Sequence, residues 1–167
     1  MKAKYFLILI SLIISLFIYL FYRTDKTIVN EIVIRLISFD SYLYIKEAVV
    51  KFMPLNKLVV FSLPEGLWVF CITLTSRSYY IAIYKWHANC VYIPIIFCVG
   101  LEIFQLFHLT NGRFDFLDIG VSFVFWVMAG FVFADRSIKQ NIFAGLNSKA
   151  VICFATYSIV YLAHVVK

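Results

Sequence analysis

Residues 5–22 read YFLILISLIISLFIYLFY, a stretch without a single charged side chain. A transmembrane α-helix needs about 20 consecutive apolar residues, so this stretch predicts a membrane-spanning helix. The basic start MKAK could open a secretory signal, but the apolar run continues into FYRTDKT without a small-residue cleavage site. We therefore expect an uncleaved first span.

The rest of the 167-residue chain is similar, because 63% of all residues are hydrophobic and only 14% are charged. Such a composition excludes an ordinary water-facing surface and predicts an integral membrane protein. We expect an all-α fold, a polytopic membrane helix bundle that forms one domain over residues 1–167. Five transmembrane helices are predicted, at approximately residues 5–22, 62–84, 91–109, 116–133 and 151–166.

Residues 23–57 are too polar to cross a bilayer. Charged residues recur among apolar ones in IVNEIVIRLISFDSYLYIKEAVVKF, which is typical of amphipathic helices lying at a membrane surface. We expect one or two short interfacial helices here, broken near residues 39–41 and ending before Pro54. The second span follows, and Ser62 is its expected N-cap, just before LPEG.

The net charge of +6 arises from 15 basic and 9 acidic residues. The basic residues are spread through the loops and form no block, so nucleic-acid binding is not predicted. Basic residues of short loops concentrate on the cytoplasmic side of a membrane and contact anionic lipid headgroups. We therefore predict membrane lipids as partners, a cytoplasmic N-terminus, and an outward-facing turn at residues 111–118.

The four cysteines lack the paired spacing of a metal site. Cys71, Cys90, Cys98 and Cys153 lie in or beside apolar segments, as expected of small buried or lipid-facing residues. Neither disulfides nor a bound metal are predicted, and no motif indicates a cofactor.

Polar side chains gather around the turn between the third and fourth predicted spans, in GLEIFQLFHLTNGRFDFLDIG at residues 100–120. Glu102 and Gln105 share a helix face because they are three residues apart. Arg113 follows the Asn-Gly turn, and Asp118 lies one turn into the next helix. Glu65, in the first turn of the second span, is expected on the same side of the membrane. Charged side chains inside a bilayer are costly and usually functional, so these five residues form the predicted binding site; catalytic residues are not assigned.

Each of these residues also has a purely structural explanation. Glu102 could pair with Arg113 only to hold two helices together, and Arg113 could simply extend to the membrane surface. Asp118 or Asp115 could cap the fourth helix, and Asp115 is the favoured cap. Glu65 could be an ordinary first-turn acid.

The same residues resemble the VanZ-like family of small bacterial integral membrane proteins. That family pairs an acidic residue and a glutamine near the end of one span with a Gly-Arg turn and an aspartate opening the next span. In this chain the pattern is formed by Glu102, Gln105, Gly112, Arg113 and Asp118.

A second segment, LPEGLW at residues 63–68, resembles the part of the family that opens an earlier span. The chain departs from the family in its fourth span, where GVSFVFWVMAG is aromatic instead of glycine-rich and lacks the asparagine often found soon after the aspartate. The resemblance implies a cell-envelope role in the cytoplasmic membrane of a bacterium, and a link to susceptibility to the glycopeptide teicoplanin.

Three functions agree with the sequence. The leading hypothesis is a protein that binds or modifies an envelope component, such as a lipid-linked or peptide headgroup, with Arg113 holding an anionic group and Glu102 or Asp118 accepting a proton. The second is a non-enzymatic structural or accessory protein whose polar cluster only locks helices together. A proton-linked transporter is less favoured, because the chain shows no internal repeat or pair of broken helices.

Overall fold

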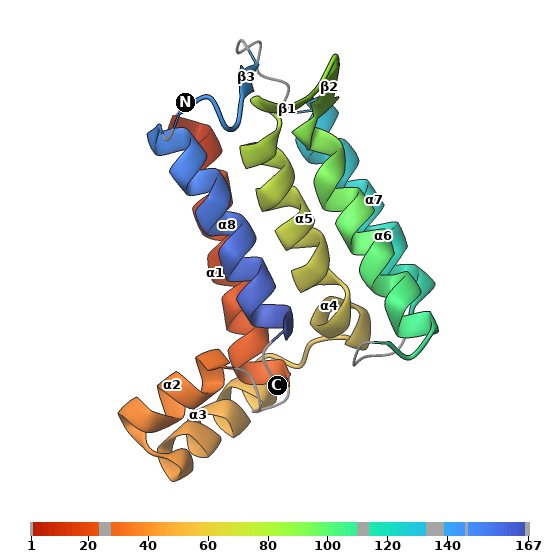
Figure 1. The fold of residues 1–167 in the computed structure, drawn as a ribbon. Coiled ribbons are helices and arrows are strands. Elements are labelled where there is room, and N and C mark those ends of the chain that lie inside the picture. The colour runs from red at the N-terminus through yellow and green to blue at the C-terminus, as the bar shows by residue number, and fades with distance from the viewer. Residues whose placement is uncertain (1, 24–27, 110–113, 133–138, 146, 166–167) are drawn as a thin grey trace.

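The computed structural model describes residues 2–23, 28–109, 114–132, 139–145 and 147–165. The chain is mostly helical, and its long helices lie side by side along one common direction (Figure 1). These helices are α1 (Lys2–Tyr22), α5 (Leu63–Ser76), α6 (Ile93–Leu106), α7 (Phe116–Val127) and α8 (Ser148–Val165). The helical fold is confirmed, while the number of membrane spans stays a prediction.

Helix α5 occupies the centre of this bundle. Helices α1, α6, α7 and α8 all pack against it, and every residue from 66 to 76 is buried. One apolar core joins Ile8 of α1, Phe70 and Leu74 of α5, and Ala129 after the end of α7. Side chains on all faces of α5 therefore contact protein.

Within the described residues, two helices are long and apolar enough to cross a bilayer by length and composition, Lys4–Tyr22 and Lys57–Ser76. Two shorter apolar helices, Cys90–Leu106 and Phe116–Phe131, accompany them. The outer face of α1 exposes large apolar side chains, among them Phe6, Leu9 and Ile13. Extended apolar surfaces of this kind mark sites that contact a membrane or another protein. These features favour membrane association.

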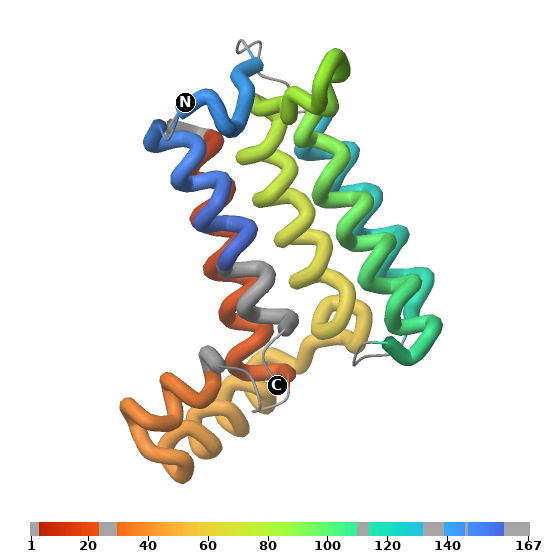
Figure 2. Tube along the Cα trace, in the orientation of Figure 1, coloured from red at the N-terminus to blue at the C-terminus, as the bar shows by residue number. Residues whose placement is uncertain are grey.

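A helical hairpin projects from one end of the bundle, as Figure 2 shows. It consists of α2 (Ile28–Ile37) and α3 (Phe39–Phe52), separated by Ser38, whose φ of 71° interrupts the helix. One or two short helices ending before Pro54 were predicted, and the structure has two, with the break slightly earlier than expected. The buried Tyr42 ties the hairpin to α1, because its hydroxyl donates to the Leu20 carbonyl at 2.7 Å.

The predicted second span, residues 62–84, is wrong at both ends. Helix α4 (Lys57–Phe61) precedes Ser62, which has helical backbone angles and makes no side-chain cap; Asn56 caps α4 instead. At the other end α5 stops at Ser76, and the chain continues as a strand. Aromatic and β-branched residues predominate in YYIAI, and both types favour a strand.

A small three-stranded sheet closes the opposite end of the bundle, and the all-α prediction omitted it. Strand β1 (Tyr79–Ile83) pairs antiparallel with β2 (Trp86–Asn89) and parallel with β3 (Gln140–Asn141). The β1–β2 turn has two residues, and Tyr84 takes a φ of 57° that suits such a tight hairpin.

The remaining span boundaries shift by a few residues. A short 3₁₀ turn, η1 (Cys90–Tyr92), leads into α6, and α7 continues as a π-helical segment, η2 (Met128–Val132). Helix α8 begins at Ser148, earlier than predicted. We call the end with α2–α4 the hairpin end, and the end with β1–β3 and the first turns of α1 and α8 the sheet end (Figure 1).

Candidate carboxylate site

Three carboxylates from three helices meet near the hairpin end. Glu65 of α5, Glu102 of α6 and Asp118 of α7 each place a carboxylate oxygen within 4.8 Å of the other two. Glu102 is 1% exposed, and the other two side chains are half-buried. The structure thus brings together three of the five residues that the sequence predicted.

The close approach of α5 and α7 depends on Gly66. A Cβ atom at this position would lie 2.5 Å from the Phe125 ring and 2.8 Å from a Val121 methyl group. Real Cβ atoms do not approach other heavy atoms so closely, so glycine is required at this crossing. Because Gly66 follows Glu65 directly, the same contact brings Glu65 against the α7 helix that carries Asp118.

Hydrogen bonds fix two of the three carboxylates. The Asp115 backbone N–H donates to Glu102 Oε2 at 2.9 Å, and the Cys98 thiol donates to Glu65 Oε1 at 3.2 Å. The side chain of Asp115 accepts from the Leu117 N–H at 2.9 Å, which confirms its predicted role as the N-cap of α7. These bonds connect α5 with α6 and α6 with the start of α7.

Asp118 differs from the other two carboxylates. Its Oδ1 atom is buried and accepts no hydrogen bond from any described residue. The Ser122 hydroxyl, one turn further along α7, is also fully buried. A buried carboxylate oxygen without a donor is energetically unfavourable, so Asp118 has capacity for a ligand that supplies positive charge or N–H groups.

Arg23 and the aromatic ring of Tyr19 lie beside this carboxylate site. Arg23, just after α1, acts electrostatically on Glu65, and its guanidinium donates to the Tyr19 hydroxyl and to the Val60 and Phe61 carbonyls. It also stacks over the Tyr19 ring, 4.5 Å from the centroid. The guanidinium is thereby held at the end of α4 and adds positive potential beside the site.

Two other residues were predicted to belong to the site, Gln105 and Arg113. Gln105 is half-buried, one turn beyond Glu102 on α6. Arg113 lies outside the described residues. Sequence reasoning missed Cys98 and Gly66 as site residues, although Cys98 precedes Glu102 by four residues and therefore shares its helix face.

Three carboxylates this close cannot all carry a charge without compensation. In a poorly solvated position, neighbouring carboxylates share protons or bind a cation. Two kinds of ligand fit such oxygens: an ammonium group, which has three N–H donors, and a hard divalent cation, which prefers six or more oxygen ligands.

Comparisons of the chain with protein-family models, with curated proteins and with solved structures give no match. The case for a function therefore comes from the carboxylate site and its position in the bundle.

Proposed function

We propose that the chain is a polytopic protein of the bacterial cytoplasmic membrane that binds a lipid-linked or peptide component of the cell envelope. The carboxylates of Glu65, Glu102 and Asp118 receive a positively charged group of that component. The observation that carries the proposal is the convergence of these three carboxylates, from three different helices, within 4.8 Å. The VanZ-like resemblance adds the envelope setting and the link to teicoplanin-type susceptibility.

The membrane setting is supported by the exposed apolar residues of the bundle. Large apolar side chains are exposed on helices beyond α1, for example Ile96 on α6 at 67% and Phe123 on α7 at 53%. In the proposed arrangement the five spans are α1, α4–α5, η1–α6, α7–η2 and α8. Bases predominate at the sheet end, so it faces the cytoplasm together with the N-terminus, and the carboxylates open outward.

An ammonium group fits the site better than a metal ion. Glu65 and Glu102 both already accept hydrogen bonds from the protein, which reduces the oxygens left for a metal that prefers six or more. An ammonium group needs only three acceptors, and the three carboxylates supply one each. Amino groups are common on peptide components, which agrees with an envelope ligand.

A second candidate function is a structural one, in which the cluster only holds the helices together. Its support is the pair of bonds from Asp115 to Glu102 and from Cys98 to Glu65, which connect three helices. The two candidates differ at Asp118, which takes no part in these two bonds. In a ligand site, loss of its charge abolishes binding without destabilising the ligand-free protein. In a helix lock, the variant changes susceptibility only as far as it changes the protein level.

The Asp118→Asn variant separates these functions. We expect the purified ligand-free protein to keep or raise its melting temperature, because a carboxylate beside two others is removed. We also expect bacteria producing the variant to lose the change in teicoplanin susceptibility that the wild-type protein confers. Asp40→Asn, an exposed acid on α3, is the matched control and leaves both readouts unchanged.

Direct binding is tested with methylammonium and with magnesium ions on the protein in detergent. Stabilisation by methylammonium that disappears in Asp118→Asn supports the ammonium site, and stabilisation by magnesium alone replaces it with a metal site. If Asp118→Asn lowers the melting temperature while susceptibility follows protein level, the cluster is a structural lock.

A further inference from the structure

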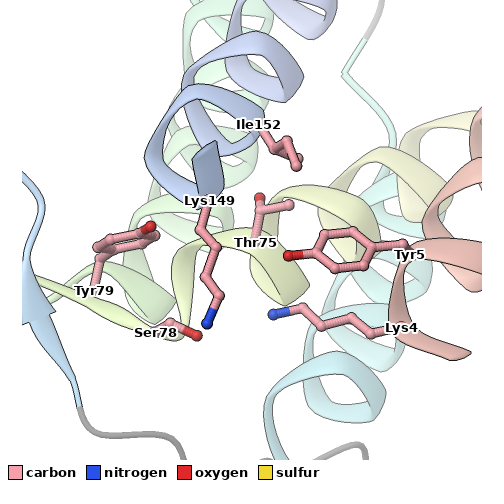
Figure 3. Close-up of a pocket in the computed structure, with 7 residues that line it drawn as sticks. All are labelled: Lys4, Tyr5, Thr75, Ser78, Tyr79, Lys149 and Ile152. Atoms are coloured by element: carbon pink, nitrogen blue, oxygen red, sulfur yellow. The ribbon is translucent and has the colours of Figure 1, made fainter. Parts of the chain in front are cut away.

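One face of the β1–β2 hairpin runs from the protein core out to the surface. Tyr79, Ile81 and Ile83 share this face, because alternate residues of a strand point to the same side. Tyr79 is 3% exposed and lines a small cavity together with Lys149 of α8 (Figure 3). Ile81 is half-buried and packs against the core that contains Tyr79, whereas Ile83 is 59% exposed. The apolar face therefore continues beyond the point where protein covers it.

The second strand extends this apolar face. Trp86 is paired with Ile83 in the register of the hairpin, so the two side chains lie next to each other on the same face. Trp86 is 80% exposed, and Tyr84, in the turn between the strands, is 97% exposed. We call residues 83–86 the hairpin tip. It presents two aromatic rings and a β-branched side chain that no part of the core covers.

The opposite face of the hairpin is more polar. The rings of Tyr80 and His87 meet there edge to face, with centroids 4.9 Å apart. Asn89 lies on the same face, and its Oδ1 atom accepts from Lys139 Nζ at 2.8 Å. A two-stranded ribbon with one polar and one apolar face is suited to the boundary between water and an apolar phase.

The hairpin lies where α6 begins, because β2 leads directly into η1 (Figure 1). Tyr92 of η1 is 48% exposed, and Ile96, one turn further on, is 67% exposed. The proposed function places this exposed side of α6 in the bilayer. The hairpin is then at the level of the headgroups, where tryptophan and tyrosine are enriched in membrane proteins.

The charge of this region complements an anionic surface. Lys85 is exposed in the turn, between Tyr84 and Trp86. The described residues of the sheet end include no carboxylate. The cytoplasmic leaflet carries anionic lipids, and a base near its surface is attracted to them.

We propose that the hairpin tip is an anchor that inserts into the cytoplasmic leaflet and binds anionic lipid. Ile83 and Trp86 contact the upper part of the acyl chains, and Lys85 contacts the anionic headgroups. The inference rests on the membrane setting of the proposed function but not on its carboxylate site, which lies at the other end of the bundle.

The test uses the fluorescence of Trp86 in the full-length protein, incorporated into lipid nanodiscs. Subtracting the emission of Trp86→Phe isolates this residue, since Trp68 and Trp126 are buried and present in both proteins. We expect lipid brominated in the upper acyl chain to quench Trp86, and acrylamide to quench it at least about twofold less than free tryptophan. Protection should be stronger with phosphatidylglycerol than with phosphatidylcholine, and Lys85→Gln should remove this difference.

Two variants of β1 test which face inserts. Ile83→Glu places a carboxylate on the apolar face, and we expect acrylamide then to quench Trp86 nearly as strongly as free tryptophan. Ala82→Glu is the matched control, because it adds the same charge at an exposed position of the same strand on the opposite face. It should leave Trp86 protected.

Full acrylamide quenching of Trp86 in a protein that co-elutes with the discs would overturn the proposal, and so would equal effects of the two glutamates. Equal protection in both lipids would overturn the assignment to anionic lipid. Protection in nonionic detergent that rises with protein concentration would assign the face to a second copy of the chain. If Ile83→Glu fails to fold, quenching of the wild-type protein by brominated lipid decides alone. Failure of the protein to enter the discs is a different result, because it refutes the membrane setting of the proposed function itself.

Discussion

The two ends of the bundle differ in the sign of their charged residues and in whether these residues are buried. At the hairpin end, acids and bases are mixed, and three carboxylates are brought inside by the crossing of α5, α6 and α7. At the sheet end the described charged residues are all basic, and they lie on loops or first turns. They include Lys4, Arg77, Lys85, Lys139 and Lys149. The carboxylate site thus depends on helix packing, whereas the basic residues of the sheet end lie at the surface, where helices begin or end.

The largest expected effect is a difference in cysteine labelling between the two ends, because we propose that they face opposite sides of the membrane. The test introduces one cysteine at the hairpin end by Leu109→Cys and one at the sheet end by Lys85→Cys. Both positions are exposed. A membrane-impermeant maleimide should label the first in intact cells and the second only after permeabilisation. The wild-type protein should stay unlabelled, because its four cysteines are buried.

The reverse labelling pattern would invert the proposed orientation. Labelling of both positions in intact cells would show that the two ends are not separated by a bilayer.

The next largest effect is expected from Glu102→Ala, which should lower the free energy of unfolding by about 3 kcal/mol. The substitution leaves a cavity and deprives the Asp115 N–H of its acceptor. Glu102→Gln retains an acceptor oxygen and should cost less. At the sheet end, Lys149→Ala should stay within about 0.5 kcal/mol, because the side chain is exposed. If unfolding titrations show that Glu102→Ala and Lys149→Ala lose the same free energy of unfolding, the two ends do not differ in how much their charged residues stabilise the fold.

Gly66→Ala tests the helix crossing that builds the carboxylate site. The added methyl group would collide with Phe125 and Val121, so we expect a loss of about 2 kcal/mol in unfolding free energy. Gly100→Ala on α6 is the matched control, because its Cβ meets no atom within 4 Å. A neutral Gly66→Ala would mean that α5 and α7 separate easily, and the three carboxylates would not need this contact.

The smallest effect is expected from Asn147→Ala at the sheet end. Loss of the α8 cap should cost about 1 kcal/mol, since Asn147 accepts from both Ala150 and Tyr79. Ser148→Ala, an exposed neighbour, should be near neutral. An unfolding free energy that does not change in Asn147→Ala would show that α8 needs no cap.

The sequence predicted the helices well where periodicity and composition determine them. The uncharged run at residues 5–22 and the amphipathic pattern before Pro54 both correspond to helices at nearly the expected places. The strand after Ser76 was missed because Tyr79, Ile81 and Ile83 are apolar and continue the preceding helix in composition. Pairing with residues 86–89 and 140–141 determines their conformation, and this depends on distant parts of the chain.

The site was predicted in part for a related reason. Carboxylates in apolar segments stand out, so Glu65, Glu102 and Asp118 could be selected without a structure. The distances between these carboxylates could not be predicted, because the close approach of α5 and α7 depends on the absence of a side chain at Gly66. Cys98 was interpreted as a small buried or lipid-facing residue, and its bond to Glu65 becomes evident only once α5 and α6 are placed together.

The central position of α5 has a consequence for biosynthesis. Protein surrounds this helix, and buried hydroxyl groups lie along it at Thr73, Thr75 and Ser76. In the proposed bilayer, however, the ribosome delivers α5 before α6, α7 and α8 exist to cover it. The nascent chain must therefore hold a helix with polar groups against lipid or the insertion machinery until the later helices arrive. A chain truncated after β2 should consequently be a substrate for membrane quality-control proteases.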